Sequence, residues 1–515
     1  MSEINNETLF FKVWRNNYLK FLILKECKLY KDNRKRYFSN GIELRNYEFR
    51  EYIEVVSINN KRNYDLQEGD LPKNGVLKSI NIIGGILNSS IIPNGVTSVR
   101  YPEIIDHTKG NRIDITNLPP SVNSLENLTI DDFSQIPQSI TSINFNPIMS
   151  VSKKENSKLS YDQIDGNETG IPPYKKKLSE NLKTIKFGFD WDNKGSKLNH
   201  NDLPCNLLTL DLGSYKNILE RNVLPNSITS LVVKFNESIL KGGVLPKSLK
   251  KLILSFETNV DIKFNEKKIL PEALEYLKIL FCGNESNIYI GDYILSKSLK
   301  SLEIFGGYKD KKTLSKNSFI HLNQLEHISF GDNWGSLNDF ILPNSGCLTS
   351  LDLGSKFNET IEKGVLPSSI KILKLGNHFN KSIVEDSFPI NLEQLYFGVC
   401  FNQLLPPNHL PKNLKHLFLS NDFDKILEVG SLPNGLKKLK IGEHNGRFNQ
   451  PISINVLPPT LENLELNCKN YEQLLNLNIL PTSLSVLKIR SSSKFKKINH
   501  DFIKNLPNSI KLFIN

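Results

Sequence analysis

The residues of this chain that could carry out chemistry are few and lie far apart. The nine histidines show no spacing typical of a metal site, and the chain has no glycine-rich phosphate loop, zinc-protease motif or nucleophile-elbow motif. Residues 190–195 come nearest to a calcium-binding loop. Lys194 stands where that loop needs an oxygen ligand, and Asn201 stands where it needs a bidentate glutamate. The sequence therefore predicts no catalytic residue, metal or cofactor, and binding is the chemistry that remains.

A sequence repeat predicts the structural elements that would position a binding surface. A proline, nearly always preceded by leucine, recurs at intervals that are mostly 21 to 26 residues. This spacing predicts a solenoid of stacked coils and not a globular enzyme. The prolines are Pro204, Pro225, Pro246, Pro271, Pro343, Pro367, Pro389, Pro411, Pro433, Pro458, Pro481 and Pro507.

A short hydrophobic pattern follows each proline. Leu414, Leu417 and Leu419 come after Pro411, with polar residues between them. The last two apolar positions alternate with period two, which predicts a short strand with one buried face and one exposed face. A glycine such as Gly376 often comes next, where the chain must turn out of the strand.

An aromatic residue followed by asparagine completes the unit. Phe357, Phe379, Phe401 and Phe448 occupy this position. We expect the ring to fill the side of the core opposite the strand and the asparagine to hydrogen-bond turn backbone groups. The same role is predicted for Trp191 and Trp334.

The full unit, L-P-x-S-L-x-x-L-x-L-G-x-x-F-N-x-x-I, resembles the FNIP repeat, a variant of the leucine-rich repeat. The resemblance covers roughly residues 71 to 515, in about eighteen copies when degenerate ones are included. It implies a solenoid of parallel β coils, each of about 22 residues, that acts in protein binding.

Four segments organise the chain. Residues 1–60 are predicted to form a small, mostly helical cap or a docking segment, and residues 61–146 hold degenerate repeats. Residues 147–178, rich in Lys, Ser and Asn, are predicted to be a flexible insertion. Residues 179–515 form the regular repeat solenoid.

Three interpretations of the amino-terminal segment stay open. Phe11, Trp14, Tyr18 and Phe21 have helical spacing, so they could seal the first coil as a cap. The opening also resembles the F-box-like leader of FNIP-repeat proteins, which implies docking to a ubiquitin-ligase core subunit. A basic amphipathic target of a calmodulin-like protein, anchored by Phe11 and Leu24, is the third. A cap would bury these side chains, whereas a docking segment would expose them.

The predicted partner surface lies on the strand face of residues 367 to 440. The residue between the last two core positions faces solvent, and on four successive coils it is Lys374, Tyr396, Phe418 and Lys440. Adjacent exposed aromatic side chains flanked by lysines are typical of an interface anchor for an acidic partner. Lys415, His416, Lys437 and Lys438 extend this surface.

Composition limits the remaining options. The net charge of +11 and a pI near 9.0 keep nucleic-acid binding through the basic surface as an alternative. Six singly placed cysteines and an acidic, polar start predict a cytoplasmic protein, with the nucleus as the second location, and no membrane partner. The last repeat stops at its strand, which predicts self-association through the carboxy-terminal edge. The predicted function is a non-enzymatic interaction scaffold, with substrate-receptor duty as its sharper version.

Overall fold

The computed structural model divides the chain into two compact units, Met1–Ser238 and Ile239–Asn515. It describes residues 17–59, 66–73, 75–83, 87–100, 115, 117–128, 136–145, 178–187, 197–213, 215, 217–234, 242–256, 261–264, 269–281, 287–306, 314–331, 337, 341–443, 445–490 and 493–514. Trp191, Trp334, the segment 190–195 and all of the predicted insertion except Leu178 lie outside these ranges.

Unit 1 opens with helices and continues as a parallel sheet. Each of its strands pairs with the next one along the chain. Its elements are α2 (Asn17–Asn33), β1 (Lys35–Phe38), α3 (Gly41–Arg45), η1 (Arg50–Tyr52), β2 (Val55–Asn59), β3 (Ser79–Ile83), η2 (Ser89–Ile91), β4 (Ser98–Arg100), β5 (Ser124–Leu128), β6 (Ser142–Phe145), β7 (Thr184–Lys186), β8 (Thr209–Asp211) and β9 (Ser230–Lys234).

Unit 2 repeats the arrangement, with one strand of the main parallel sheet in each coil. A separate parallel pair is formed by β11 and β13. The elements are β10 (Lys251–Phe256), β11 (Asp261–Phe264), β12 (Tyr276–Phe281), β13 (Asn287–Ile290), β14 (Ser301–Phe305), β15 (His327–Phe330), β16 (Ser350–Asp352), β17 (Ile372–Lys374), β18 (Gln394–Tyr396), β19 (His416–Leu419), β20 (Lys438–Ile441), β21 (Asn463–Leu466), η6 (Leu477–Ile479), β22 (Val486–Ile489), α4 (Ser493–Ile498), α5 (His500–Lys504) and β23 (Lys511–Ile514).

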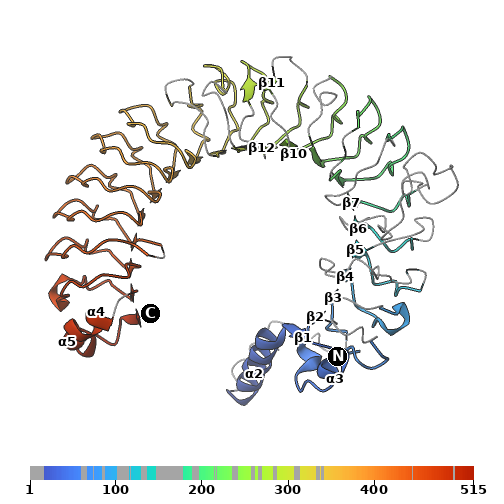
Figure 1. Ribbon diagram of the computed structural model, residues 1–515, viewed down its shortest axis with the longest axis horizontal. Coiled ribbons are helices and arrows are strands. Elements are labelled where there is room, and N and C mark those ends of the chain that lie inside the picture. The colour runs from blue at the N-terminus through green and yellow to red at the C-terminus, as the bar shows by residue number, and fades with distance from the viewer. Residues whose placement is uncertain are drawn as a thin grey trace, which may run out of the picture. The chain divides into compact units, whose positions relative to one another are not determined.

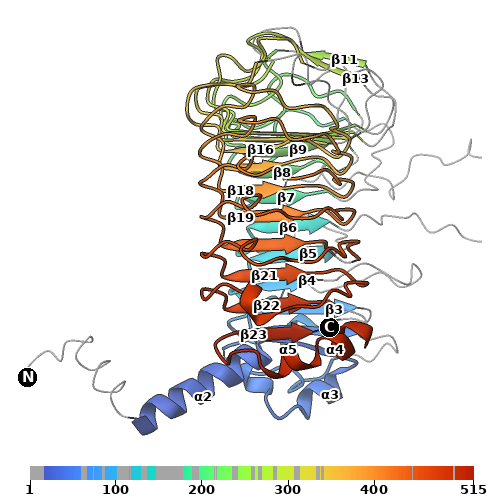
Figure 2. The same ribbon diagram turned by 90° about the vertical axis from the view of Figure 1, so that its left-hand side faces the viewer.

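The predicted parallel β solenoid is confirmed. Within each unit the strands line the inner side of the coils, and they lie parallel to one another (Figures 1 and 2). In β19, Leu417 and Leu419 are buried while His416 and Phe418 are only partly buried, as the period-two pattern predicts. The carbonyl of Pro411 accepts a hydrogen bond from the amide of Leu414 at 3.1 Å, so the proline opens the turn into the strand. The face of the strands whose side chains point away from the core and into solvent is called the sheet face below.

A ladder of stacked aromatic rings fills the other side of the core. Phe401 is fully buried, and its ring centroid lies 6.0 Å from that of Phe379 and 6.2 Å from that of Phe423. The interplanar angles at these two contacts are 12° and 1°. Neighbouring coils therefore pack ring on ring, in the arrangement that aromatic side chains favour. The ladder comprises Phe357, Phe379, Phe401, Phe423, Phe448 and Tyr471.

The predicted asparagine role is also confirmed, but the hydrogen bond crosses from one coil to the next. The side-chain oxygen Oδ1 of Asn358 accepts from the amide of Asn380 at 2.9 Å, and Oδ1 of Asn380 accepts from the amide of Asn402 at 2.9 Å. Asp424 takes the same position one coil later and accepts from the amide of Asn449 at 2.9 Å. Each side chain thus satisfies a backbone donor that the turn leaves without a partner.

Close approach between coils explains the glycines after the strands. A Cβ atom on Gly376 would overlap the carbonyl oxygen of Gly354, and one on Gly398 would overlap that of Gly376. Gly354 itself has a φ of +78°, which favours glycine. At Gly376 and Gly398 the approach of the previous coil therefore leaves no room for a side chain.

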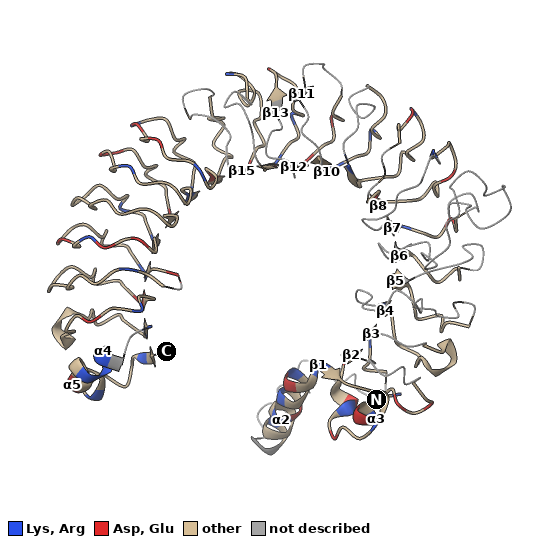
Figure 3. Ribbon diagram, in the orientation of Figure 1, with Lys and Arg blue, Asp and Glu red and all other residues tan. Residues whose placement is uncertain are grey.

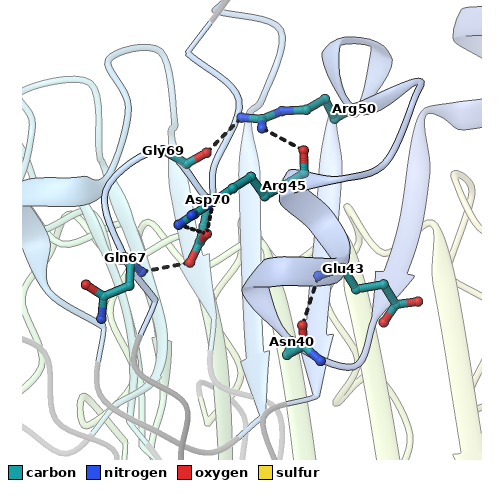
Figure 4. A network of polar contacts seen from close by, with 7 residues as sticks. All are labelled: Asn40, Glu43, Arg45, Arg50, Gln67, Gly69 and Asp70. Atoms are coloured by element: carbon teal, nitrogen blue, oxygen red, sulfur yellow. Dashed lines mark hydrogen bonds and ion pairs between the residues drawn. The ribbon is translucent and has the colours of Figure 1, made fainter.

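A buried polar network fastens the amino-terminal elements to the first coils (Figure 4). The side chain of Asp70 is fully buried, and its carboxylate accepts hydrogen bonds from Nε of Arg45 at 2.8 Å and from the amide of Gln67 at 2.7 Å. Arg50 donates to the carbonyl oxygens of Arg45 and Gly69, each at 3.1 Å. Since β1 and β2 already pair in parallel, the sheet begins inside the segment 1–60.

Candidate protein-interaction surface

Four of the predicted partner-binding residues occupy consecutive strands at one register position. Lys374 pairs with Tyr396, Tyr396 with Phe418, and Phe418 with Lys440. The core residue before each of them is buried, which turns these four side chains to the sheet face. We call the surface made by Lys374, Tyr396, Phe418, Lys438 and Lys440 the aromatic patch.

Two stacked rings form the centre of the aromatic patch. The ring centroids of Tyr396 and Phe418 lie 4.2 Å apart with an interplanar angle of 4°. Both side chains are partly buried, and the hydroxyl of Tyr396 donates to Oε1 of Gln394 at 2.8 Å. Burial raises the pKa of the Tyr396 hydroxyl above its usual value. The pair therefore stands as a rigid, neutral apolar feature in a charged surface.

Lysine ammonium groups lie near both rings. Nζ of Lys374 lies 6.0 Å from the centroid of Tyr396, and Nζ of Lys438 lies 5.6 Å from the centroid of Phe418. Since cations are attracted to the negative face of a ring, these contacts leave the positive ring edges for a ligand. Ring edges and ammonium groups together favour a carboxylate.

Carboxylates from neighbouring coils balance part of the positive charge. Lys374 lies 3.8 Å from Asp352, and Lys438 lies 3.1 Å from Glu465. Lys440 has no carboxylate within 4.0 Å among the described residues. The lysines that extend the surface are paired as well, Lys415 with Glu393 at 2.8 Å and Lys437 with Glu462 at 3.0 Å.

Glu465 is the most buried charge near the aromatic patch. Its side chain is 10% exposed and lies between Lys438 and Lys488, at 3.1 Å and 3.3 Å. Burial raises the pKa of this carboxyl, but the two lysines outweigh burial, so the pKa is lowered. Glu465 stays ionised and holds the ammonium of Lys438 near Phe418.

His416 lies beside the patch as a neutral group at pH 7. Burial lowers the pKa of its imidazole, and the charges of Lys438 and Lys415 lower it further. The predicted residue is therefore in the expected place, but it adds hydrogen-bonding capacity and not positive charge at neutral pH.

The predicted docking segment is only partly described. Phe11 and Trp14 lie outside the described residues, and Tyr18 lies in α2 without a described side chain. In α2, Phe21 is 62% exposed and Leu24 is 50% exposed. The helix carries both positive and negative residues, and it projects from the amino-terminal end of unit 1 (Figures 2 and 3).

Two hydrogen bonds attach the carboxy-terminal half of α2 to the first coils. The hydroxyl of Tyr30 donates to Glu54 at 2.7 Å, and the hydroxyl of Tyr52 donates to Glu26 at 2.6 Å. The apolar side chains of α2 thus stay exposed while its carboxy-terminal half is attached to the first coils.

The acidic partners of the patch were not predicted from the sequence. Asp352 and Glu465 occupy the same register position as Lys374 and Lys440, one coil away in each case. The repeat length alone would have placed them beside these lysines. Aligning the coils would therefore have shown that part of the basic surface is balanced.

The described parts of the chain contain no metal site, membrane-spanning helix or disulfide. The described residues include no group of three His, Cys, Asp or Glu side chains that could hold a metal ion, and no helix among them is long and apolar enough to cross a membrane. The cysteines described there, Cys27, Cys205, Cys347, Cys400 and Cys468, are free thiols.

The parallel coils with their aromatic and asparagine ladders define a leucine-rich-repeat-like solenoid, a class of protein that typically acts as a non-enzymatic interaction scaffold. The chain contains FNIP repeats: the FNIP Repeat family model matches residues 193–232, 357–400, 401–444 and 448–492. The resemblance in the sequence is thereby confirmed.

Several solved structures are similar to this chain. The crystal structure of CroV588, described as a novel circular LRR protein structure, is 26% identical, with coverage of 90% of this chain and 76% of that chain and a TM-score of 0.48. The TLR13–ssRNA13 complex is 17% identical, with coverage of 86% and 71% and a TM-score of 0.54, and it supports the fold alone. YopM from Yersinia enterocolitica WA-314 is 17% identical, with coverage of 90% and 91% and a TM-score of 0.34. No curated protein matches the chain.

Proposed function

We propose that this protein is a receptor that captures a partner with an acidic surface on the aromatic patch. The observation that carries the proposal is the stacked pair of Tyr396 and Phe418 between two lysines. Rigid aromatic side chains supply a large contact area at low entropic cost, and such residues dominate binding energy at interfaces. Lys440 adds a positive charge that no described carboxylate balances within 4.0 Å.

The partner is expected to place a carboxylate over the ring edges. There it would interact with the positive edges of Tyr396 and Phe418 and with the ammonium groups of Lys374 and Lys438. The existing ion pairs of these lysines moderate the attraction, because Asp352 and Glu465 already lie beside them. A mixed apolar and acidic surface therefore fits better than a highly charged nucleic acid.

The second part of the proposal assigns docking to α2. The exposure of Phe21 and Leu24 is what a docking segment predicts and a cap does not. A ubiquitin-ligase core subunit and a calmodulin-like protein are the two candidate partners for this helix, and the location would be the cytoplasm or the nucleus. Self-association through the edge of β23 stays a prediction that light scattering at various protein concentrations tests.

Quantitative affinity purification with paired variants tests the patch. Tyr396→Ser combined with Phe418→Ser should reduce capture of the partner at least tenfold, with a loss of stability of only about 1 kcal/mol from the stacked pair. The matched control is Ile390→Ser with Leu404→Ser, since these side chains are 63% and 57% exposed in the same coils but outside the strands. Equal capture by the patch variant and the wild type would contradict the proposal.

A separate pair of variants tests docking through the helix. Phe21→Ser with Leu24→Ser should release the docked protein while leaving capture by the aromatic patch intact. Deleting residues 1–60 would not be a clean test, because β1 and β2 belong to the sheet. Retention of every copurifying protein by the helix variant would contradict the docking role.

A further inference from the structure

A polar hollow on the sheet face of unit 1 has the features of a second binding site. Its volume is about 500 Å³, within the range typical of ligand sites. Outward residues of β1 to β5 line it, which places it in a different unit from the aromatic patch. We call it the amino-terminal hollow.

Small polar side chains form the floor of this hollow. Ser57, Ser79, Asn81 and Ser98 come from β2, β3 and β4. Nδ2 of Asn81 donates to Oγ of Ser57 at 3.1 Å, which leaves the Ser57 hydroxyl proton and the Asn81 carbonyl for a ligand. The floor can therefore both donate and accept hydrogen bonds, as a peptide backbone requires.

Long side chains form the two ends. Lys35 and Tyr37 extend from β1, and the ring of Tyr37 is 57% exposed. At the other end Arg100 lies 3.4 Å from Glu126 through Nε, which uses one of its five N–H donors. Arg36 also lines the hollow, and its Nη2 donates to Oδ1 of Asn33 at 2.6 Å.

The distance between the two cations sets the form of the ligand. Lys35 and Arg100 lie three strand steps apart and two residues apart in register, which at about 4.8 Å for each step and about 3.3 Å for each residue is about 16 Å between backbones. An extended peptide rises about 3.3 Å for each residue, so side chains four residues apart span about 13 Å. The long side chains of Lys35 and Arg100 can cover the few ångströms by which the separation of their backbones exceeds this span. One small anion would reach only one end.

We propose that the amino-terminal hollow binds an extended acidic peptide segment with carboxylates four residues apart, which pair with Lys35 and Arg100 over the serine floor. The inference rests on the proposed function only in taking the ligand to be a segment of a protein. Because the hollow and the aromatic patch share no residue, either can fail without the other.

Calorimetric titration of the full-length protein with the blocked peptide Glu-Ser-Gly-Ser-Glu tests the inference. We expect a Kd below about 1 mM, and about tenfold weaker binding by the Lys35→Gln, Arg100→Gln double variant, because two ion pairs are lost. The matched control is Lys73→Gln, which removes an exposed lysine of the same unit that pairs with Glu68. The Tyr396→Ser, Phe418→Ser variant should bind the peptide as the wild type does.

A charge reversal separates recognition from a structural effect. The Lys35→Glu variant should lose the acidic peptide and bind a peptide with one terminal glutamate replaced by lysine. Absence of binding up to several times the expected Kd, equal binding by the double variant, or tighter binding of a five-nucleotide single-stranded RNA or inorganic phosphate would each overturn the inference.

Discussion

Removal of one ring from the aromatic ladder should unfold the coils around it. Phe401 is the best position, because it is fully buried and contacts the rings of Phe379 and Phe423 above and below. A third ring, that of Phe397, lies 4.0 Å away between centroids. Phe401→Ala would therefore leave a cavity bounded by three aromatic side chains.

The expected loss follows from burial and stacking. Truncation of a buried phenylalanine to alanine costs about 3 to 5 kcal/mol, and each lost ring contact adds about 0.5 to 1.5 kcal/mol beyond burial. Ring neighbours on both sides place Phe401→Ala in the upper half of the first range. Since each coil depends on the next, β17 to β20 should lose stability together.

Native-state hydrogen exchange measures this loss coil by coil. In Phe401→Ala, the opening free energy of amides in β18 and β19 should fall by about 4 kcal/mol. The control Leu404→Ala, at a side chain that is 57% exposed, should change it by less than about 0.5 kcal/mol. A loss below about 1 kcal/mol at Phe401 would refute the assignment of the ladder to the core.

Three further predictions follow from the coil contacts. Gly376→Ala should lower the free energy of unfolding measured in urea by about 1 to 3 kcal/mol, because the added Cβ atom would overlap the previous coil. An unchanged free energy of unfolding would contradict the close approach of the coils. Asn380→Ala should cost about 1 to 3 kcal/mol by leaving the amide of Asn402 without an acceptor, whereas Asn380→Asp, which copies Asp424, should be tolerated. Burial lowers the pKa of His327 and His416 below 6.5, so the unfolded state binds more protons near pH 6. Stability to urea should therefore be full above pH 6.5 and fall at lower pH, with a shallower fall in the His327→Gln, His416→Gln variant.

The repeat spacing was sufficient to predict the repeat strands, the turn prolines and four of the six rings of the aromatic ladder. Period-two alternation after each proline marks a strand whatever the surroundings. Phe357, Phe379 and Phe401 each come four positions after the last core residue of their strand, and Phe448 is the same element displaced by three residues. Phe423 and Tyr471 were missed, although the ladder continues through them, because no glycine marks the turn before either ring.

The partner surface was predictable in position and less so in charge. Lys374, Tyr396, Phe418 and Lys440 share one register position, which the repeat alone dictates. The lowered pKa of His416 and the burial of Glu465 depend on how neighbouring coils pack, and spacing contains no information on that. The amino-terminal hollow was missed for a related reason, because it depends on small residues between long ones across five strands.

The most direct test of the proposed receptor role is photo-crosslinking from the sheet face. A benzophenone amino acid at position 396 or 418 keeps an aromatic side chain there, and the same group at 390 or 404 in the same coils serves as the control. The proposed role predicts one common adduct from positions 396 and 418 and none from the controls. Adducts to the captured partner from positions 390 and 404 alone would contradict it.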